Sequence, residues 1–278
     1  MKILLTGASG YLGSYVLSEL LKQNHKIIAL SRNFIEIYCH RNVQYIPFDL
    51  NKLNCNLFDK KLEADCLIHL AWENLKDYKN HLTNQQNQLS SFMFIKSAIY
   101  AGIKHISVAG TCLEYGLQNG CLSEETIPTP STPYGIAKNN LRINLESLQN
   151  EIPFNLNWFR LFYLFDARSR QNSLFGQLQK AIDQNSPFFP MSGGEQIRDF
   201  IPIELAAKMF VEIACNKPGS GIINVCSGNP IKVKDAVNEY IQTIKTTIKP
   251  LLGNHPYPDY EPMEFWGCTK KLNMLYEK

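Results

Sequence analysis

A glycine-rich turn near the start of the chain constrains the fold more than any other feature. The segment TGASGYLG places Gly7, Gly10 and Gly13 between a short apolar run, Ile3–Leu5, and a segment whose apolar residues recur with helical period. The three glycines suit a tight turn, a close backbone approach to a diphosphate, and close packing of a helix on a strand. The start of that helix offers free N–H groups to phosphate oxygens. The turn therefore predicts a dinucleotide-binding α/β fold.

Short apolar runs alternate with segments of helical period through the first 165 residues. Several runs are continuous rather than alternating, which suits parallel strands buried on both faces. The predicted strands are Ile3–Leu5, Ile27–Leu30, Val43–Ile46, Cys66–Leu70, His105–Val108 and Leu156–Leu161. Helices are predicted between the first two strands, over 84–101 and over 135–150. This order predicts a Rossmann-type, doubly wound parallel sheet over residues 1–165.

The alternation of strands and helices breaks down after residue 165. Helices are predicted over 172–185, 203–215 and 232–248, with a strand at Ile222–Val225. The tail, residues 253–268, is rich in Pro, Tyr and Glu and shows no clear period. We therefore expect residues 166–278 to form a small, irregular, substrate-binding region packed on the sheet. The alternative is that part of this segment returns to the sheet.

Composition and charge narrow the class of protein. The 278 residues are 45% hydrophobic and 19% charged, as in ordinary globular domains, and the net charge of +3 is spread without blocks. We therefore expect no nucleic-acid partner. The eight cysteines form no CxxC pair and no zinc-ligand spacing, which predicts reduced thiols and no metal site. No apolar run has the length of a membrane span, so a soluble, cytoplasmic protein is expected.

A candidate catalytic group follows the fifth predicted strand. TPYGIAK places Tyr134 and Lys138 four residues apart, on one face of a helix. This spacing alone is weak, because Tyr100 and Lys104 share it at a helix end. AGTCLEYG, which supplies Thr111 ahead of Tyr134, distinguishes the first pair from the second. A phenol, an ammonium and a hydroxyl suit proton transfer to a carbonyl oxygen during hydride reduction, and a merely structural Tyr–Lys helix is the alternative.

Taken together, these elements resemble the extended short-chain dehydrogenase/reductases, the NAD-dependent epimerase/dehydratase family. The resemblance runs from Thr6 to the RDF motif near residue 200. It implies that Thr111, Tyr134 and Lys138 are catalytic, with Lys138 also holding the nicotinamide ribose. It further implies a nucleotide-diphosphate sugar as substrate and a homodimer that pairs helices 84–101 and 135–150.

The end of the second predicted strand bears on the choice between NAD and NADP. Ser31, Arg32 and Asn33 include no carboxylate that could accept a hydrogen bond from the ribose 2′-hydroxyl. An arginine suits a 2′-phosphate through its charge and its two-pronged donor geometry. We therefore predict NADP(H) in preference to NAD(H), the alternative being that Arg32 is a solvated loop residue. The other predicted cofactor contacts are Gly7, Ser9, Gly10, Tyr11, Leu12, Gly13, Asp49, Leu50, Leu70, Ala71, Trp72, Asn87, Tyr134 and Lys138.

Two of these predicted contacts have structural alternatives. Asp49 matches the position that contacts adenine in the resembling family, but it is equally suited to cap a short helix over 50–54. Trp72 ends the segment HLAW, where the family has HLAA beneath the cofactor. Its indole either shapes the substrate pocket or only packs.

Substrate contacts are predicted mainly in the last third of the chain. Asn172 and Ser173 open a predicted helix, whose first N–H groups suit a diphosphate. Arg198 matches the arginine that holds the nucleotide phosphate in the resembling family, and a salt bridge with Asp199 or another surface carboxylate is its alternative. Asp199 is expected to support the loop, and Thr111 completes the predicted substrate contacts.

The residues after Thr111 indicate the type of reaction. Sugar-nucleotide dehydratases of the family carry an Asp-Glu pair there, and epimerases resembling GDP-fucose synthase carry a cysteine two residues after the catalytic hydroxyl. This chain has Cys112 and Leu113 at those positions, and Glu114 comes one residue too late. No acid or base beyond the Thr-Tyr-Lys group is evident, so we expect plain hydride transfer.

The expected reaction is therefore the NADPH-dependent reduction of a nucleotide-linked 4-keto-6-deoxy sugar. The segments GTCLEYG and SGGEQIRDF resemble enzymes that make CDP-abequose or dTDP-6-deoxy-talose. Such a reductase supplies a deoxysugar for a surface polysaccharide, either O-antigen or capsule. An NAD-dependent nucleotide-sugar 4-epimerase and a non-catalytic NADP(H)-binding regulator are the alternatives.

Overall fold

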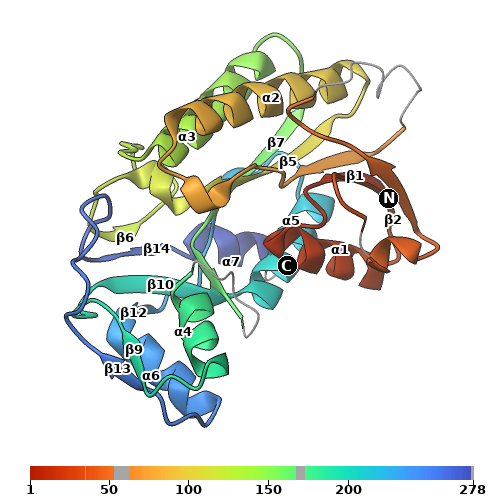
Figure 1. Ribbon diagram of the computed structural model, residues 1–278. Coiled ribbons are helices and arrows are strands. Elements are labelled where there is room, and N and C mark those ends of the chain that lie inside the picture. Colours follow the sequence, from red (N-terminus) through yellow and green to blue (C-terminus); the bar gives the residue numbers. More distant parts are fainter. Residues whose placement is uncertain (35, 53–62, 167–172, 277–278) are drawn as a thin grey trace.

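A seven-stranded parallel sheet forms the centre of the molecule (Figure 1). The computed structural model describes residues 1–34, 36–52, 63–166 and 173–276. The strand order β11-β7-β5-β4-β1-β2-β3 runs outward in both directions from the pair β1 and β4, as in doubly wound Rossmann-type folds. The strands are β1 Lys2–Thr6, β2 Lys26–Ser31, β3 Val43–Pro47, β4 Cys66–His69, β5 His105–Thr111, β7 Asn155–Leu161 and β11 Gly221–Val225.

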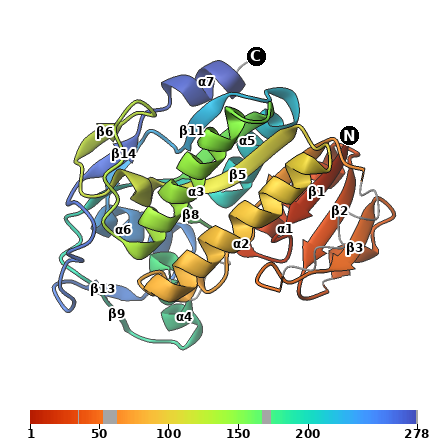
Figure 2. The same cartoon turned by 90° about the horizontal axis from the view of Figure 1, so that it is seen from above.

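Helices cover both faces of this sheet. On one face, α2 and α3 lie side by side, as Figure 2 shows from above, and on the other face α1 packs against α5 while α7 contacts α5 and β11. No helix in the described part of the chain is long and apolar enough to cross a membrane. The helices are α1 Tyr11–Lys22, α2 His81–Tyr100, α3 Pro133–Gln149, α5 Ile203–Asn216 and α7 Lys270–Tyr276.

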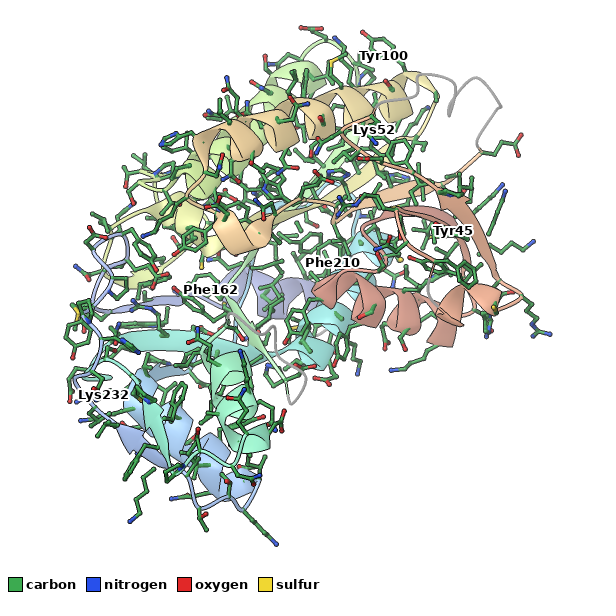
Figure 3. The ribbon with its side chains drawn as sticks, in the orientation of Figure 1. Tyr45, Lys52, Tyr100, Phe162, Phe210 and Lys232 are labelled. Carbon is green, nitrogen blue, oxygen red and sulfur yellow. The ribbon has the colours of Figure 1, made fainter. Side chains whose placement is uncertain are left out.

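The continuous apolar strands follow from this two-sided cover. Successive side chains of a strand point to opposite faces, so Ile3 and Leu5 join the core under α1 and α5, while Leu4 joins the core under α2 and α3. The ring of Phe210 from α5 stacks on Phe159 of β7 with 3.9 Å between centroids, and Figure 3 shows Phe210 on that side of the sheet. The strands therefore bury apolar side chains on both faces of the sheet, and full burial of such a side chain contributes roughly 2 kcal/mol.

A smaller part lies beside the carboxyl ends of the strands (Figure 1). It combines a three-stranded sheet, two short strand pairs and two helices around a separate apolar core. Its strands are β8 Tyr163–Phe165, β9 Phe188–Pro190, β10 Ile197–Pro202, β12 Pro230–Lys232 and β13 Lys249–Leu251, its helices are α4 Leu174–Asp183 and α6 Val233–Thr243, and β6 Gly120–Leu122 pairs with β14 Phe265–Gly267 at its edge.

Most predicted helices and strands are present, and their ends lie within three residues of the predicted ends. The helix predicted over 232–248 was wrong at its end, since α6 stops at Thr243 and Lys245 adopts a left-handed φ of 54° before β13. Three elements beyond residue 165, namely α5, β11 and α7, return to the large sheet. The chain therefore crosses between the two parts more than once, and a site between them draws on residues far apart in sequence.

Candidate active site

A cavity of about 770 Å³ lies between the carboxyl ends of the parallel strands and the smaller part. Doubly wound folds bind their ligands at this edge of the sheet. The tail segment from His255 to Glu261 contributes part of the opposite wall. The cavity lining includes most of the predicted site residues, namely Gly7, Ser9, Gly10, Tyr11, Leu12, Gly13, Ser31, Arg32, Leu50, Leu70, Ala71, Trp72, Thr111, Tyr134, Lys138, Ser173 and Arg198.

The turn between β1 and α1 can only be made by glycines. Gly7 has a φ of +71°, and a Cβ there would lie 2.7 Å from the Ala71 nitrogen. A Cβ on Gly13 would lie 2.0 Å from the Gly7 carbonyl oxygen, which accepts the Gly10 N–H at 2.9 Å. No side chain caps the start of α1 at Gly10. The turn thus leaves backbone N–H groups and space at the cavity wall, which fits the diphosphate of a dinucleotide.

Thr6 joins this turn to the loop after β4. Its hydroxyl oxygen accepts the N–H groups of Leu70 and Ala71, each at 3.2 Å, and lies 3.0 Å from Nδ1 of His69. Burial lowers the pKa of His69 to about 3, and the charge of Lys138 acts in the same direction, so the imidazole is neutral. The HLA stretch is therefore held against the glycine turn by uncharged hydrogen bonds.

The three predicted catalytic residues line one cavity. Thr111 ends β5, and its hydroxyl oxygen accepts the Leu113 N–H at 3.3 Å. Tyr134 and Lys138 lie one helical turn apart near the start of α3, with the Lys138 ammonium 5.9 Å from the Tyr134 ring centroid. Lys138 is buried and donates to the Ala109 carbonyl at 2.8 Å. Burial lowers the pKa of Lys138 to about 7, with the Glu114 carboxylate acting in the opposite direction.

The second tyrosine–lysine pair lies elsewhere. Tyr100 is the last residue of α2 and is 64% exposed, at the outer end of that helix in Figure 3. Lys104 follows Gly102, whose φ is +101°, and leads directly into β5. The second pair is therefore a helix end at the surface.

Trp72 contacts both Tyr134 and Lys138, the predicted catalytic pair. The Lys138 ammonium lies 3.9 Å from the Trp72 ring, and the Trp72 and Tyr134 rings meet edge to face with 5.7 Å between centroids. The indole N–H donates to Asn84 of α2 at 3.0 Å. An aromatic face stabilises a nearby ammonium. Trp72, which departs from the HLAA pattern, therefore offsets part of the free-energy cost of burying the charged Lys138.

Glu114 lies behind Thr111, the predicted catalytic threonine, and is fully buried. Its carboxylate accepts the Thr111 N–H, the Trp158 indole N–H and the Arg160 Nε–H, each at 2.9 Å. Arg142 of α3 brings a second guanidinium to 4.0 Å. Glu114 does not line the cavity, which agrees with its exclusion as an acid or base, and it instead fixes the backbone that carries Thr111.

Three predicted contacts within the described residues lie outside the cavity lining. Asn33 is exposed, and its carbonyl accepts the Ser31 hydroxyl at 2.6 Å. The Asp49 carboxylate accepts the Asn51 N–H at 3.1 Å, as its capping alternative requires. Asn87 is buried in α2 and hydrogen-bonds the backbone of the loop after β4. Asn172 lies outside the described residues, as do the last residues of the short helix considered for Asp49.

The two described substrate candidates of the smaller part are already engaged within the protein. The Ser173 hydroxyl caps α4 by accepting the Gly176 N–H at 3.1 Å. Arg198 is buried and pairs with Glu261 at 3.0 Å, with its guanidinium 4.9 Å from the Phe265 ring. The salt-bridge alternative for Arg198 is therefore realised, with Glu261 as the partner. Asp199 accepts the N–H groups of Ser227 and Gly228, so it supports the loop as expected.

Sequence reasoning missed several residues of the cavity wall. Glu73, one residue after HLAW, pairs with Arg32, and Glu261 pairs with Arg198. Tyr260 of the tail and Tyr78 both line the cavity, and their rings meet with 5.7 Å between centroids. The aromatic and acidic composition of the tail was the one available signal, and it does not specify these partners.

Replacement of Lys138 by methionine tests the burial of its charge. The folded pKa of about 7 lies below the ordinary 10.5, so protonation opposes folding below pH 7, and this penalty is relieved as the pH rises from 7 to 10.5. We expect Lys138→Met to raise the free energy of unfolding by roughly 3 kcal/mol at pH 6, with the gain shrinking towards pH 10. Urea unfolding at pH 6, 8 and 10 measures the difference.

Lys22→Met is the matched control, because that lysine is exposed at the end of α1. It should change stability by a similar small amount at each pH. A Lys138→Met variant that is destabilised equally at all three pH values would contradict the assignment of a buried, charge-penalised lysine.

Replacement of Glu114 by glutamine tests the buried network. The change leaves Arg160 buried without its carboxylate and weakens the hydrogen bond to the Thr111 N–H. We expect a loss of about 3–5 kcal/mol in the free energy of unfolding, measured by urea titration. Glu146→Gln removes the other carboxylate partner of Arg142, one that is 40% exposed, and should cost only about 0–1 kcal/mol. Equal effects of the two changes would refute the role of Glu114.

Comparison with known proteins finds relatives that match most of the chain. The chain is 36% identical over 276 residues to a dTDP-6-deoxy-L-talose 4-dehydrogenase (NAD(+)) of Aggregatibacter actinomycetemcomitans, covering 96% of this chain and 100% of that protein. It is 25% identical to a UDP-glucose 4-epimerase of Bacillus subtilis, covering 86% and 81% of the two chains.

Among solved structures, a UDP-glucuronic acid 4-epimerase from Bacillus cereus in complex with NAD has the same fold. Its TM-score is 0.85 at 20% identity, over 100% of this chain and 91% of that one. The family model described as "NAD dependent epimerase/dehydratase family" matches residues 3–226, which include the glycine turn and all three predicted catalytic residues. The chain therefore belongs to the NAD-dependent epimerase/dehydratase family.

Proposed function

We propose that the protein is a nicotinamide-dependent oxidoreductase that reduces the 4-keto group of a nucleotide-linked 4-keto-6-deoxy sugar. The reaction would supply a deoxysugar for a surface polysaccharide. The observation that carries the proposal is the arrangement of Thr111, Tyr134 and Lys138 around one cavity, beside a glycine turn that fits a diphosphate. The name of the relative with 36% identity, a 6-deoxy-talose 4-dehydrogenase, supports the same substrate class.

The residues that follow Thr111 support plain hydride transfer over elimination or epimerisation at a second carbon. Cys112 is buried, and burial raises the pKa of its thiol far above the ordinary value, so it does not serve as a base. Leu113 lines the cavity with an apolar side chain. Glu114 is occupied by its three hydrogen-bond donors. The remaining chemistry near Thr111 is that of a hydroxyl, a phenol and an ammonium.

In this proposal each residue acts on the carbonyl oxygen of the sugar. A bound nicotinamide supplies the hydride. Tyr134 donates the proton that the oxygen requires, and Thr111 donates a hydrogen bond that stabilises the developing negative charge. Lys138 stabilises the resulting phenolate through its positive charge, since an ammonium favours a neighbouring anion. Trp72, which contacts Lys138 and Tyr134, positions both.

The predicted preference for NADP(H) rests on Arg32 and on the absence of a carboxylate at the end of β2. Its side chain is 58% exposed and pairs with Glu73, and the talose dehydrogenase relative is named for NAD(+). Arg32 therefore supports NADP(H) less strongly than the sequence indicated, because its charge is paired in the folded protein.

Replacement of Tyr134 by phenylalanine tests the proposed reaction. Wild-type protein should consume the reduced cofactor stoichiometrically with a CDP-, dTDP-, GDP- or UDP-linked 4-keto-6-deoxy sugar, followed by nicotinamide absorbance. Tyr134→Phe should lower kcat at least about 100-fold, because the proton donor is lost, and should leave cofactor affinity unchanged. Tyr100→Phe, at the second tyrosine–lysine pair, is the control and should keep full activity.

Two results would contradict the proposal in different ways. Cofactor binding without turnover of any of these sugars indicates the non-catalytic regulator. Interconversion of two nucleotide hexoses with no net change in cofactor absorbance indicates the 4-epimerase, which the B. subtilis relative's name favours.

We also propose a homodimer formed by α2 and α3. These helices lie side by side, and each exposes a line of large apolar side chains at helical spacing. Soluble monomers rarely expose such continuous patches, and a second copy of the same surface would bury them. The residues are Leu82, Leu89, Met93 and Tyr100 on α2, and Ile136 and Ile143 on α3.

A charge on this surface should dissociate the dimer. We expect light scattering to give the mass of two chains for the wild type and of one chain for the double variant Leu89→Glu, Ile143→Glu, because two buried carboxylates per chain would be desolvated. Ile127→Glu changes an exposed isoleucine that belongs to neither helix and should leave the dimer intact. A monomeric wild type would disprove the interface.

A further inference from the structure

A carboxylate from another loop lies beside the end of β2, although the residues at the end of β2 include no carboxylate. Glu73, in the loop after β4, pairs through one oxygen with the Arg32 guanidinium at the end of β2. Its other oxygen accepts the Asn51 side-chain N–H. Arg32 and Glu73 both line the large cavity. Three loops that are separate in the sequence therefore meet at one acidic side chain.

This meeting point is the adenosine end of the predicted dinucleotide site. Ser31, next to Arg32, donates its hydroxyl to the Ser9 hydroxyl of the glycine turn at 3.0 Å. In doubly wound folds, the end of β2 beside that turn faces the adenosine ribose, where a carboxylate accepts from the 2′-hydroxyl or an arginine binds a 2′-phosphate.

The backbone of Glu73 is held in place from behind. The Glu73 N–H donates to the Asn87 side-chain oxygen at 3.0 Å, and the Asn87 side-chain N–H donates to the Glu73 carbonyl at 3.0 Å. Asn87 is fully buried in α2. The Glu73 side chain itself is 27% exposed, against 58% for Arg32. Of the two charges, the carboxylate is thus the better fixed.

The pair removes the electrostatic reason for a 2′-phosphate to bind here. With its charge compensated by Glu73, Arg32 offers no net positive field, and a phosphate dianion that approached it would meet the carboxylate as well. A neutral 2′-hydroxyl meets no such repulsion and can donate to the carboxylate. The same pair therefore disfavours one cofactor and accommodates the other.

We propose that Glu73 is a specificity-determining residue that makes the protein select NAD(H) over NADP(H) by neutralising Arg32 and accepting the ribose hydroxyl. The inference rests on the proposed function only in placing a nicotinamide dinucleotide in this cavity. It reverses the preference predicted from the end of β2 alone, because the deciding carboxylate comes from the loop after β4.

Calorimetric titration with NAD⁺ and NADP⁺, without sugar substrate, tests this role. Wild-type protein should bind NAD⁺ at least about tenfold more tightly than NADP⁺. Glu73→Gln frees Arg32 while keeping the side-chain shape, so NADP⁺ should bind at least about fivefold more tightly than to wild type, and NAD⁺ about two- to fivefold more weakly.

Two further variants distinguish an effect of the Arg32–Glu73 pair from the effect of removing any surface carboxylate. The double variant Arg32→Gln, Glu73→Gln should lose the gain for NADP⁺, because that gain requires the freed guanidinium. Glu195→Gln removes another exposed carboxylate that pairs with two lysines, Lys232 and Lys234, and should leave both affinities unchanged. Figure 3 shows Lys232 on the opposite side of the molecule from Tyr45, whose hydroxyl donates to the Ser31 carbonyl.

The possible outcomes distinguish this inference from the proposed function. Tighter NADP⁺ than NAD⁺ binding by the wild type, or an unchanged affinity ratio in a folded Glu73→Gln variant, overturns the role of Glu73 and leaves the reductase proposal standing. Failure of the wild type to bind either dinucleotide overturns both. Thermal melting of each variant establishes that it is folded.

Discussion

The buried carboxylate of Glu114 holds together the elements that make the site. It joins the end of β5, the indole of Trp158 and the guanidinium of Arg160 on β7, and it lies near Arg142 of α3. Buried cations of this kind are tolerated only when an anion compensates them. The same negative charge opposes the loss of the proton from Lys138. The position of Thr111 and the charge of Lys138 thus depend on one side chain outside the cavity.

Close packing at Gly110 makes that arrangement compatible with the sheet. A Cβ at this position would lie 2.3 Å from the Trp158 indole nitrogen and 2.6 Å from a Glu114 oxygen. The glycine turn obeys the same rule on the cofactor side, where Gly7 and Ala71 approach too closely for a side chain. Both halves of the site therefore rest on backbone approaches that only glycine permits, with polar groups fixed around them.

The predicted substrate side of the cavity is assembled from chain segments that cross between the two parts. In the tail segment, the Tyr260 ring lies 4.2 Å from the Lys79 ammonium, and Glu261 compensates the charge of Arg198. The contact with Lys79 joins the β4–α2 loop to a residue about 180 positions later in the chain. The pairing of β14 with β6 anchors the same tail to the segment that follows β5. The fold therefore brings the tail against the loop between β4 and α2, at the side of the cavity where substrate contacts are predicted.

The sequence by itself determined the parallel sheet, the glycine turn and the Thr111, Tyr134 and Lys138 set. Each of these follows from a local pattern, because strand burial, turn geometry and helical spacing act over a few residues. The same local logic explains why the ends of short strands and of α6 were missed.

Only the tertiary structure determined which acidic and basic side chains form ion pairs. Arg32 and Glu73 are 41 residues apart, Glu114 and Arg160 are 46 apart, and Arg198 and Glu261 are 63 apart. An arginine in sequence indicates a cation, but its effect on a phosphate depends on whether a carboxylate lies beside it in space. In the proposed role of Glu73, cofactor choice depends on that long-range pairing, so the packing of loops would set it rather than the residues at the end of one strand.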